Sequence, residues 1–241
     1  MGLQLVLPGP QARASTFERW WNAQGEWVEE PNLRRAGESG VKRLRLGDSR
    51  LPLLYCKRQT GHLYRSLGHP FGRPTALREY HALRALERLG IRVPRVVYCA
   101  AQRPQGQWRA LLVTEELSGF VSLEQWYHGT ARSVGEALRH QVLRRLAEML
   151  ARLHRAGWQH GCLYPKHIFV RVEGEGDRAQ VEVALLDLEK CRRRLSCRRA
   201  SRRDMAQLRR HAEPMPDADW FRLEAEYRQA LAAVRESADG F

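Results

Sequence analysis

Three charged residues in the sequence have the types and the order that binding of a nucleoside triphosphate requires. Lys57 lies in the apolar run LPLLYCKRQ, Glu79 lies in a later helical stretch, and Asp187 closes the apolar run VALLD. A strand lysine paired with a helix glutamate clamps the phosphates of ATP, and a carboxylate after a later strand holds the bridging Mg²⁺. Each residue alone is compatible with a solvated charge, but the ordered set predicts an ATP and Mg²⁺ site.

A fourth feature is the sequence HGCLYPKHIFV, which runs from His160 to Val170 and has the layout of a phosphotransfer loop. Such a loop usually supplies a carboxylate that accepts the proton of the acceptor hydroxyl, whereas Cys162 stands at that place here. A thiol is mostly protonated at neutral pH and is a weak acceptor. Loss of a positioned general base lowers a rate by roughly 10²–10⁴-fold.

Three interpretations of Cys162 remain open. Positioning and charge stabilisation do most of the catalysis in phosphoryl transfer, so nucleotide binding and slow turnover are compatible with a missing base. A nearby carboxylate such as Glu189 could take over the role of the base. Alternatively, Cys162 is a packed structural thiol in a loop that no longer catalyses transfer.

The first half of the chain is predicted to be rich in strands, and these strands would position Lys57. Alternating apolar and polar residues predict a hairpin, and Gly37–Gly40 is predicted to form a tight turn from an earlier strand. Gly61–Pro74, rich in glycine and proline, is predicted to be a loop. The predicted strands cover residues 41–46, 51–59, 93–99, 108–114, 168–172 and 181–186.

The second half is predicted to be mainly helical. Apolar residues recur every three or four positions from Val134 until Gly157 stops the pattern. Thr75 is expected to cap an earlier helix that Gly90 ends, and Ser15 or Thr16 a short first helix. Further helices are predicted at 76–89, 203–211 and 217–237. We therefore expect one α+β domain over residues 1–241, with a small β-rich lobe (about 15–115) and a larger helical lobe (about 116–241).

The charge of the chain suggests a polyanionic partner. The 41 lysines and arginines exceed the 27 acidic residues, which gives a net charge of +14. Nucleic acid, an anionic membrane face and a phosphorylated glycolipid all fit this charge. No zinc-finger, RRM or helix-turn-helix motif is present, which disfavours nucleic acid. The densest block, Arg192–Arg203, has the simpler interpretation of a solvated basic loop.

Cysteine usage and hydropathy indicate a protein of the cytoplasm. The five cysteines show no paired metal-binding spacing, so reduced thiols are expected. No apolar run approaches the roughly 18 residues that a membrane-spanning helix needs. The first residues have no basic segment before their short apolar run, and we therefore predict no secretory signal.

Six stretches of the chain are similar to those of the lipopolysaccharide core kinase family, the small atypical kinases that phosphorylate heptose or Kdo in the inner core. They are YCKRQ, REYHALRALERLGIRVP, LLVTEEL, LARLHRAGWQHGCLYPKHIFV, LLDLEK and RRDMAQL. The resemblance extends from about Trp21 to Leu208, and its most specific parts are VTEEL and the histidine-containing loop. It implies a two-lobed protein-kinase-like fold.

The resemblance also implies roles for individual residues. Glu115–Leu117 would be the hinge whose backbone binds adenine, and Gly37–Gly40 a reduced phosphate loop. His160 would open the catalytic loop, and Asp204 would brace it. Together with Asp187, His167 would hold the metal, at a position where protein kinases carry asparagine. The family pattern after the histidine is Arg-Asp, so Gly161 and Cys162 are departures from it.

The implied activity is ATP-dependent, Mg²⁺-assisted phosphorylation of a heptose or Kdo hydroxyl, with an anionic glycolipid or core oligosaccharide as substrate. The reaction would take place in the cytoplasm, with peripheral contact of the protein at the inner membrane. The arginine block Arg192–Arg203 would contact the glycolipid. The alternative is a pseudokinase that binds nucleotide or a partner without transferring phosphate, because Cys162 replaces the aspartate.

Overall fold

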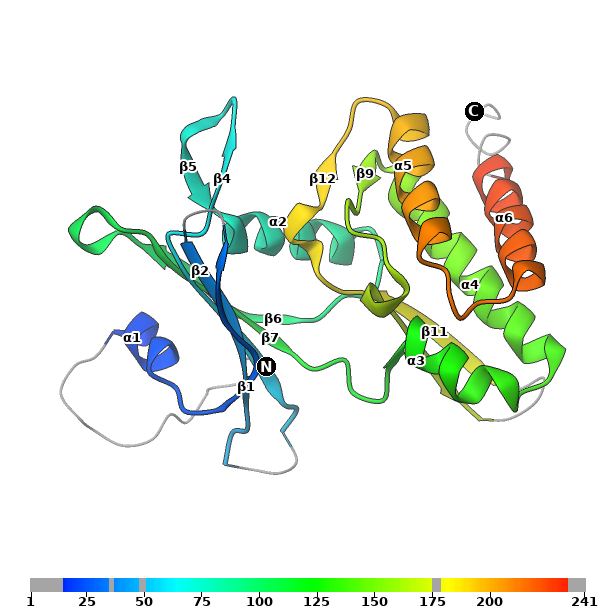
Figure 1. The fold of residues 1–241 in the computed structure, drawn as a ribbon, viewed down its shortest axis with the longest axis horizontal. Coiled ribbons are helices and arrows are strands. Elements are labelled where there is room, and N and C mark those ends of the chain that lie inside the picture. The colour runs from blue at the N-terminus through cyan, green and yellow to red at the C-terminus, as the bar shows by residue number, and fades with distance from the viewer. Residues whose placement is uncertain (1–14, 35–36, 48–50, 175–178, 234–241) are drawn as a thin grey trace.

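The computed structural model describes residues 15–34, 37–47, 51–174 and 179–233. Its N-terminal part is built on a five-stranded antiparallel sheet with the strand order β1-β2-β3-β7-β6 (Figure 1). These strands are β1 (Glu26–Arg34), β2 (Gly37–Leu44), β3 (Leu54–Thr60), β6 (Val96–Gln102) and β7 (Arg109–Glu115).

At β7 both faces of this sheet are packed against helices, since successive side chains of a strand point to opposite faces. Along β7, Leu111 and Val113 join a cluster with Phe17 and Trp20 of α1 (Thr16–Trp21). The alternate residue, Leu112, packs in the main core with α2 (Thr75–Arg88). As predicted, Ser15 caps α1.

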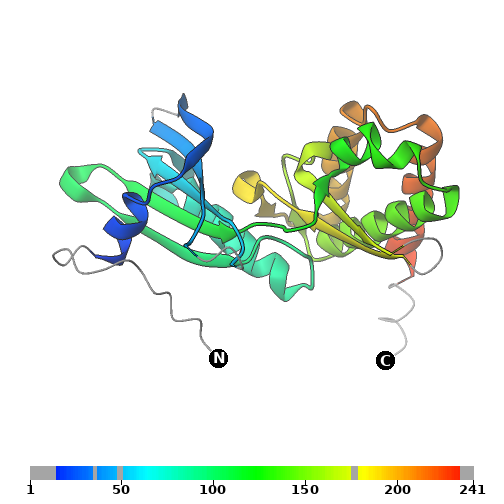
Figure 2. The same cartoon turned by 90° about the horizontal axis from the view of Figure 1, so that it is seen from below.

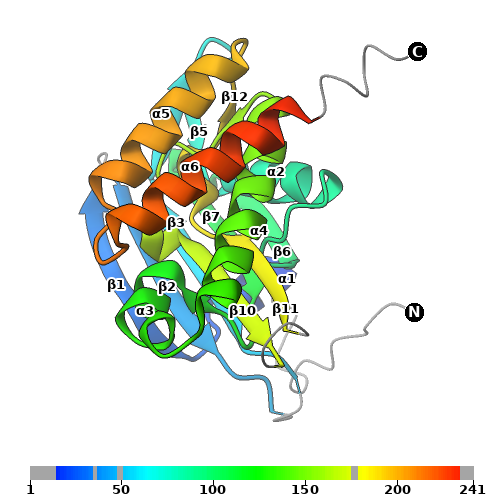
Figure 3. The same cartoon turned by 90° about the vertical axis from the view of Figure 1, so that its right-hand side faces the viewer.

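The C-terminal part is organised around α4 (Glu136–Arg155), which packs against α6 (Asp217–Ala232) and α5 (Cys197–Arg210). Figure 3 shows these three helices next to one another. A three-stranded sheet with the order β11-β10-β8 lies beside them, together with α3 (Leu123–His128). Its strands are β8 (Val121–Ser122), β10 (Ile168–Glu173) and β11 (Gln180–Leu185). The two parts form two lobes with a narrow connection (Figure 2).

Two short antiparallel strand pairs complete the described part of the chain. β4 (Leu63–Ser66) pairs with β5 (His69–Pro74), and β9 (Trp158–Gln159) pairs with β12 (Arg192–Arg193). Single 3-10 turns occur between the main elements: η1 (Pro104–Gly106), η2 (Thr130–Arg132), η3 (Pro165–His167) and η5 (Leu188–Lys190). None of the helices in the described ranges is long and apolar enough to cross a membrane.

The predicted α+β, two-lobed class is confirmed, but four local predictions were wrong. Gly37–Gly40 is not a turn; it opens β2, while residues 35–36, between β1 and β2, lie outside the described residues. A β-carbon on Gly37 would lie 2.3 Å from the backbone carbon of Gly61, and one on Gly40 would lie 2.9 Å from the nitrogen of Pro31. These glycines therefore allow close packing of backbone.

The second correction is the hairpin β4–β5, which occupies the predicted loop Gly61–Pro74. The third is the arginine block, which is not a loop, since it forms β12 and the first turns of α5. Ser196 caps α5, and Ala200, Asp204 and Leu208 form its buried face. Thr75 does not cap α2, because its hydroxyl is hydrogen-bonded to Gln59 instead. Helix α3 was not predicted.

The core of the C-terminal lobe yields a stability prediction. Leu146 of α4 is fully buried, so Leu146→Ala should leave a cavity and lower the free energy of unfolding by about 2–5 kcal/mol. Leu195→Ala makes the same chemical change at a fully exposed side chain and should alter stability by less than about 0.5 kcal/mol. Urea denaturation followed by circular dichroism compares the two variants, and equal losses would contradict the packing described here.

Candidate active site

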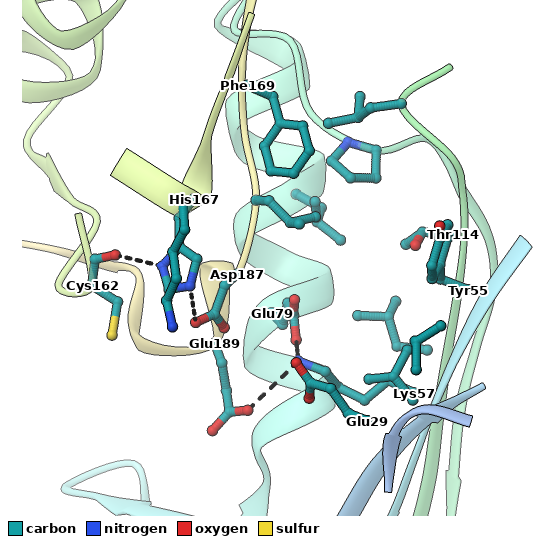
Figure 4. Close-up of a pocket in the computed structure, with 18 of the residues that line it drawn as sticks. Glu29, Tyr55, Lys57, Glu79, Thr114, Cys162, His167, Phe169, Asp187 and Glu189 are labelled. Carbon is teal, nitrogen blue, oxygen red and sulfur yellow. Dashed lines mark hydrogen bonds and ion pairs between the residues drawn. The ribbon is translucent and has the colours of Figure 1, made fainter. Parts of the chain in front are cut away.

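A cleft of about 880 Å³ lies between the two lobes and collects most of the residues that the sequence suggested (Figure 4). Its walls come from β1, β2, β3, α2 and β7 of the N-terminal lobe and from the loop before β10, the end of β11 and η5 of the C-terminal lobe. Lys57, Glu79, Glu115, Leu117, Cys162, His167 and Asp187 all line it.

Lys57 is fixed in the middle of β3, where it pairs with Val41 on one side and Leu112 on the other. Its Nζ donates to Oε2 of Glu79 over 2.5 Å and lies 3.6 Å from Oε2 of Glu189. Burial alone would lower the pKa of Lys57, but the charges of Glu79, Glu189 and Asp187 outweigh it and raise that pKa above the usual lysine value. Lys57 is therefore a permanent cation in the cleft.

Glu79 faces Lys57 because the start of α2 is tied to β3. The side chain of Gln59, two residues after Lys57 on β3, accepts a hydrogen bond from the backbone nitrogen of Ala76 at 2.9 Å. The same amide group exchanges hydrogen bonds with the hydroxyl of Thr75. Since Glu79 lies one helical turn after these residues, this contact sets the rotation of α2 that directs its carboxylate to Lys57.

Asp187 follows β11 in a backbone conformation that L-residues rarely adopt, with φ 57° and ψ 62°. Such a conformation costs energy and is typical of functional sites. Burial would raise the pKa of Asp187, but Lys57, His167 and His160 lower it below its usual range. The carboxylate is thus charged at neutral pH and available to a cation.

His167 faces Asp187 with a nitrogen that is an acceptor in the neutral ring. Nδ1 donates to the carbonyl oxygen of Cys162 at 2.8 Å, which leaves Nε2, 3.6 Å from Oδ2 of Asp187, as the acceptor whenever the ring is neutral. Two acceptors that face each other are stabilised by a cation between them. Within the described residues, no group of three or more histidine, cysteine or acidic side chains forms a complete metal site. Two protein ligands nevertheless fit Mg²⁺, which usually takes its other ligands from water and phosphate.

Asp204 of α5 holds the loop that contains Cys162. Its two carboxylate oxygens accept hydrogen bonds from the backbone nitrogens of His160, at 2.6 Å, and Gly161, at 3.0 Å, and Oδ2 also lies 3.2 Å from Nε2 of His154. Burial would raise the pKa of Asp204, but these hydrogen bonds and the contact with His154 lower it. The bracing role that the family resemblance implied fits this geometry.

His160, expected among the catalytic side chains, is fully buried, and both of its ring nitrogens contact the backbone. Nε2 donates to the carbonyl oxygen of Leu186 at 3.0 Å, while Nδ1 accepts from the nitrogen of Cys162 at 3.2 Å. Burial lowers the pKa of His160 to about 4, so the ring is neutral at physiological pH. It positions the loop beside Asp187 and does not line the cleft.

Cys162 lies on the cleft wall with only 5% of its surface exposed. Its backbone groups are used by the histidines on either side, whereas Figure 4 shows its sulfur directed away from His167. Gly161 precedes it with φ 78°, and a β-carbon there would lie 2.9 Å from the carbonyl oxygen of Lys190. The loop thus has no room at 161 for the arginine of the family pattern.

Of the remaining predicted site residues, those of the hinge line the cleft and the glycines of the phosphate loop do not. Glu115 and Leu117 line the cleft as a hinge segment would, and the backbone nitrogen of Glu116 donates to the carbonyl oxygen of Leu53. Neither Gly37 nor Gly40 lines the cleft, although Ser39 between them does. The expected phosphate-loop glycines therefore act through strand packing.

Sequence reasoning missed several polar residues of the cleft. His62 lies 3.3 Å from Glu189, which the sequence suggested only as a substitute base and which here faces Lys57. Lys166 and Lys190 also line the cleft and add positive charge. Each lysine is next to a motif residue, Lys166 to His167 and Lys190 to Glu189, which is a weak indication that it lies in the site. The sequence around His62 contains no such indication.

The comparisons with known proteins agree with this geometry. The model of the lipopolysaccharide kinase (Kdo/WaaP) family matches residues 18–227. The chain belongs to this family. The Escherichia coli (strain K12) protein InaA is 43% identical over 217 residues, which is 90% of this chain and 97% of InaA. The solved structure of WaaP in complex with acyl carrier protein matches with a TM-score of 0.68 over 93% of this chain and 88% of that one. At 21% identity, the WaaP match shows the kinase-like fold.

The bracing carboxylate generates a prediction about pH. Asn at position 204 has one acceptor oxygen, so Asp204→Asn leaves an N–H of the loop facing an amide N–H, and the variant should lose about 1–3 kcal/mol of stability at pH 7. The pKa of Asp204 is lower in the folded protein than in the unfolded chain, where it is about 4. The carboxylate therefore contributes its full stabilisation of the fold above about pH 4, and this stabilisation is lost as the pH falls through the folded-state pKa.

Urea denaturation between pH 7 and pH 2.5 measures both effects. Asp204→Asn should be less stable than the wild type at pH 7, and the difference should shrink at the acid end. A constant difference across this range would show that the charge of Asp204 is not what stabilises the loop. Asp219→Asn, at a partly exposed carboxylate that accepts from Tyr127, is the matched control.

Proposed function

We propose that the protein is an ATP-dependent phosphotransferase that acts on a sugar hydroxyl of the lipopolysaccharide inner core, a heptose or Kdo. Family membership supports a kinase-like role. The observation that carries the proposal is the convergence of the Lys57–Glu79 ion pair and the Asp187–His167 pair on one interlobe cleft. These are the two sets of charges that a phosphoryl donor requires.

Each part of the cleft suits one part of ATP. The hinge segment Glu115–Leu117 would receive the adenine, and Lys57, oriented by Glu79, would contact the phosphates. Asp187 and His167 would hold Mg²⁺, which would neutralise the charge that develops on the phosphate oxygens. Glu189 competes for Lys57 at 3.6 Å, so phosphates would have to displace that carboxylate from the ammonium.

In the transfer step, the acceptor hydroxyl oxygen forms a bond to the γ-phosphorus while the bond from phosphorus to the β–γ bridging oxygen breaks, and ADP leaves. The transition state is loose, so the hydroxyl proton departs late and can pass to water. Cys162 occupies the place of the expected base and contributes no carboxylate. We therefore expect transfer to be slow.

Cys162 is also the observation that favours a second candidate, a pseudokinase that binds nucleotide without transferring phosphate. Its side chain is nearly buried, and its backbone contacts to His160 and His167 do not depend on the side chain. The loop is thus well formed without a base. Both candidates require nucleotide binding and differ only in transfer.

Nucleotide binding is the first property to test. Lys57→Met removes the cation facing the phosphates, and since a charged hydrogen bond contributes about 1.5–3 kcal/mol, MgATP affinity should fall roughly 10- to 100-fold. The shift of the melting temperature with MgATP concentration gives this affinity. Lys42→Met on β2, outside the cleft, should leave it unchanged.

Lys57→Met also leaves Glu79 without its partner, which would itself destabilise the fold. The double variant Lys57→Met/Glu79→Gln removes that unpaired charge and should still bind MgATP weakly. Full affinity in the double variant would mean that Lys57 does not contact nucleotide.

Transfer is tested with labelled ATP, Mg²⁺ and dephosphorylated core oligosaccharide. The wild type should phosphorylate the acceptor slowly, Lys57→Met should abolish the signal, and Cys162→Asp should raise the rate by about 10²–10⁴-fold by restoring a general base. Cys162→Ser is the matched control and should stay near the wild-type rate. No transfer by the wild type, combined with clear MgATP stabilisation, would replace the kinase proposal with the pseudokinase.

A further inference from the structure

Two projecting segments of the structure end in fully exposed apolar side chains. Leu67 lies in the turn of the β4–β5 hairpin with a relative exposure of 104%, and Phe71 on β5 reaches 91%. Leu195, between β12 and α5, reaches 110%. Single exposed apolar residues are ordinary, but three on two projecting segments are better explained by a partner.

The two segments come from different lobes and project to the same side of the molecule. In Figure 1 the turn of the β4–β5 hairpin and the segment that joins β12 to α5 both stand at the upper edge. They stand at the upper edge again in Figure 3, after a quarter turn about the vertical axis. The views agree, so one flat surface could touch both segments at once.

Positive charge surrounds both apolar tips. Residues 61–78 and 191–203 contain no aspartate or glutamate. The buried face of α5, Ala200, Asp204 and Leu208, turns the arginines of its first turns to the outside. The exposed arginines of the two segments are Arg65, Arg192, Arg193, Arg198, Arg199, Arg202 and Arg203.

Both segments are held in place at the rim of the cleft. His62, which lines the cleft, immediately precedes β4, and Lys190, which also lines it, lies two positions before the start of β12. The Arg78 guanidinium stacks over the ring of Tyr64 on β4 at 4.5 Å and donates to the carbonyl oxygen of Glu189. A surface that contacts the tips would therefore lie over the rim of the cleft.

We propose that this face, formed by the β4–β5 turn and the β12–α5 segment, docks onto an anionic lipid bilayer, with Leu67, Phe71 and Leu195 inserted among the lipids and the surrounding arginines bound to lipid phosphates. Apolar side chains that insert and basic residues that bind headgroups act together at membrane surfaces. A nucleic acid would use the arginines but would gain nothing from the apolar tips. The proposed function explains only why the cleft should open towards the bilayer, which holds the glycolipid acceptor; docking itself does not depend on transfer.

Vesicle sedimentation of the full chain, without nucleotide, tests the proposal. Vesicles of phosphatidylcholine that contain about 30% phosphatidylglycerol are compared with vesicles of phosphatidylcholine alone. The wild type should bind only the anionic vesicles, and less strongly as salt is raised. Leu67→Ser/Phe71→Ser/Leu195→Ser should weaken binding by about tenfold or more. Arg198→Gln/Arg199→Gln/Arg202→Gln should weaken it by roughly fivefold for each arginine.

Matched controls keep the result specific to this face. Phe221→Ser removes an exposed aromatic side chain on α6, and Arg84→Gln/Arg88→Gln/Arg144→Gln removes three exposed arginines of α2 and α4. Both should bind like the wild type. Absence of binding to anionic vesicles would overturn the proposal. So would binding that the triple serine variant retains in full, which would indicate a site for polyanions such as nucleic acid or an acidic protein. Vesicle binding by a protein that fails to transfer phosphate would reject only the proposed function.

Discussion

The ammonium group of Lys57 is the charge on which the arrangement of the cleft depends. It lies between Glu79 of α2 and Glu189 of η5, so one cation joins the sheet and helix of the N-terminal lobe to the C-terminal lobe. The nearby Asp187 makes the cluster negative when no ligand is present. A buried excess of negative charge is costly unless cations compensate it. In the proposed function, Mg²⁺ would add to this cluster the positive charge that it lacks, together with Lys166 and Lys190 of the cleft wall.

The loop around Cys162 is built independently of the side chain at that position. Asp204 holds the backbone of His160 and Gly161, and the two histidines on either side use the backbone nitrogen and oxygen of Cys162. A thiol in place of a carboxylate at position 162 therefore leaves the hydrogen bonds of the loop intact. The hydrogen bonds that shape the loop do not involve the side chain at position 162, which explains how the loop keeps its conformation with a thiol there.

The sequence predicted the parts of this molecule that follow from periodicity and from residue type. The alternation around Lys57 and the apolar stripe of α4 define their elements locally, and the ordered residues Lys57, Glu79 and Asp187 do converge on one cleft. Contacts between distant segments could not be predicted in this way. The pairing of His62 with Glu189 joins residues 127 positions apart. The glycines of β2 were wrongly interpreted as a turn. Their actual role is close packing against Gly61 and Pro31, a contact between distant segments that the sequence alone does not show.

The left-handed backbone at Gly161 limits which side chains this part of the loop can accept. At position 162 the hydrogen bonds are made by the backbone, so a replacement of the side chain there would keep them. Position 161 is closed, since any side chain would meet the carbonyl group of Lys190. The two positions are therefore unequal: a substitution at 162 keeps the hydrogen bonds of the loop, whereas a substitution at 161 has to displace backbone.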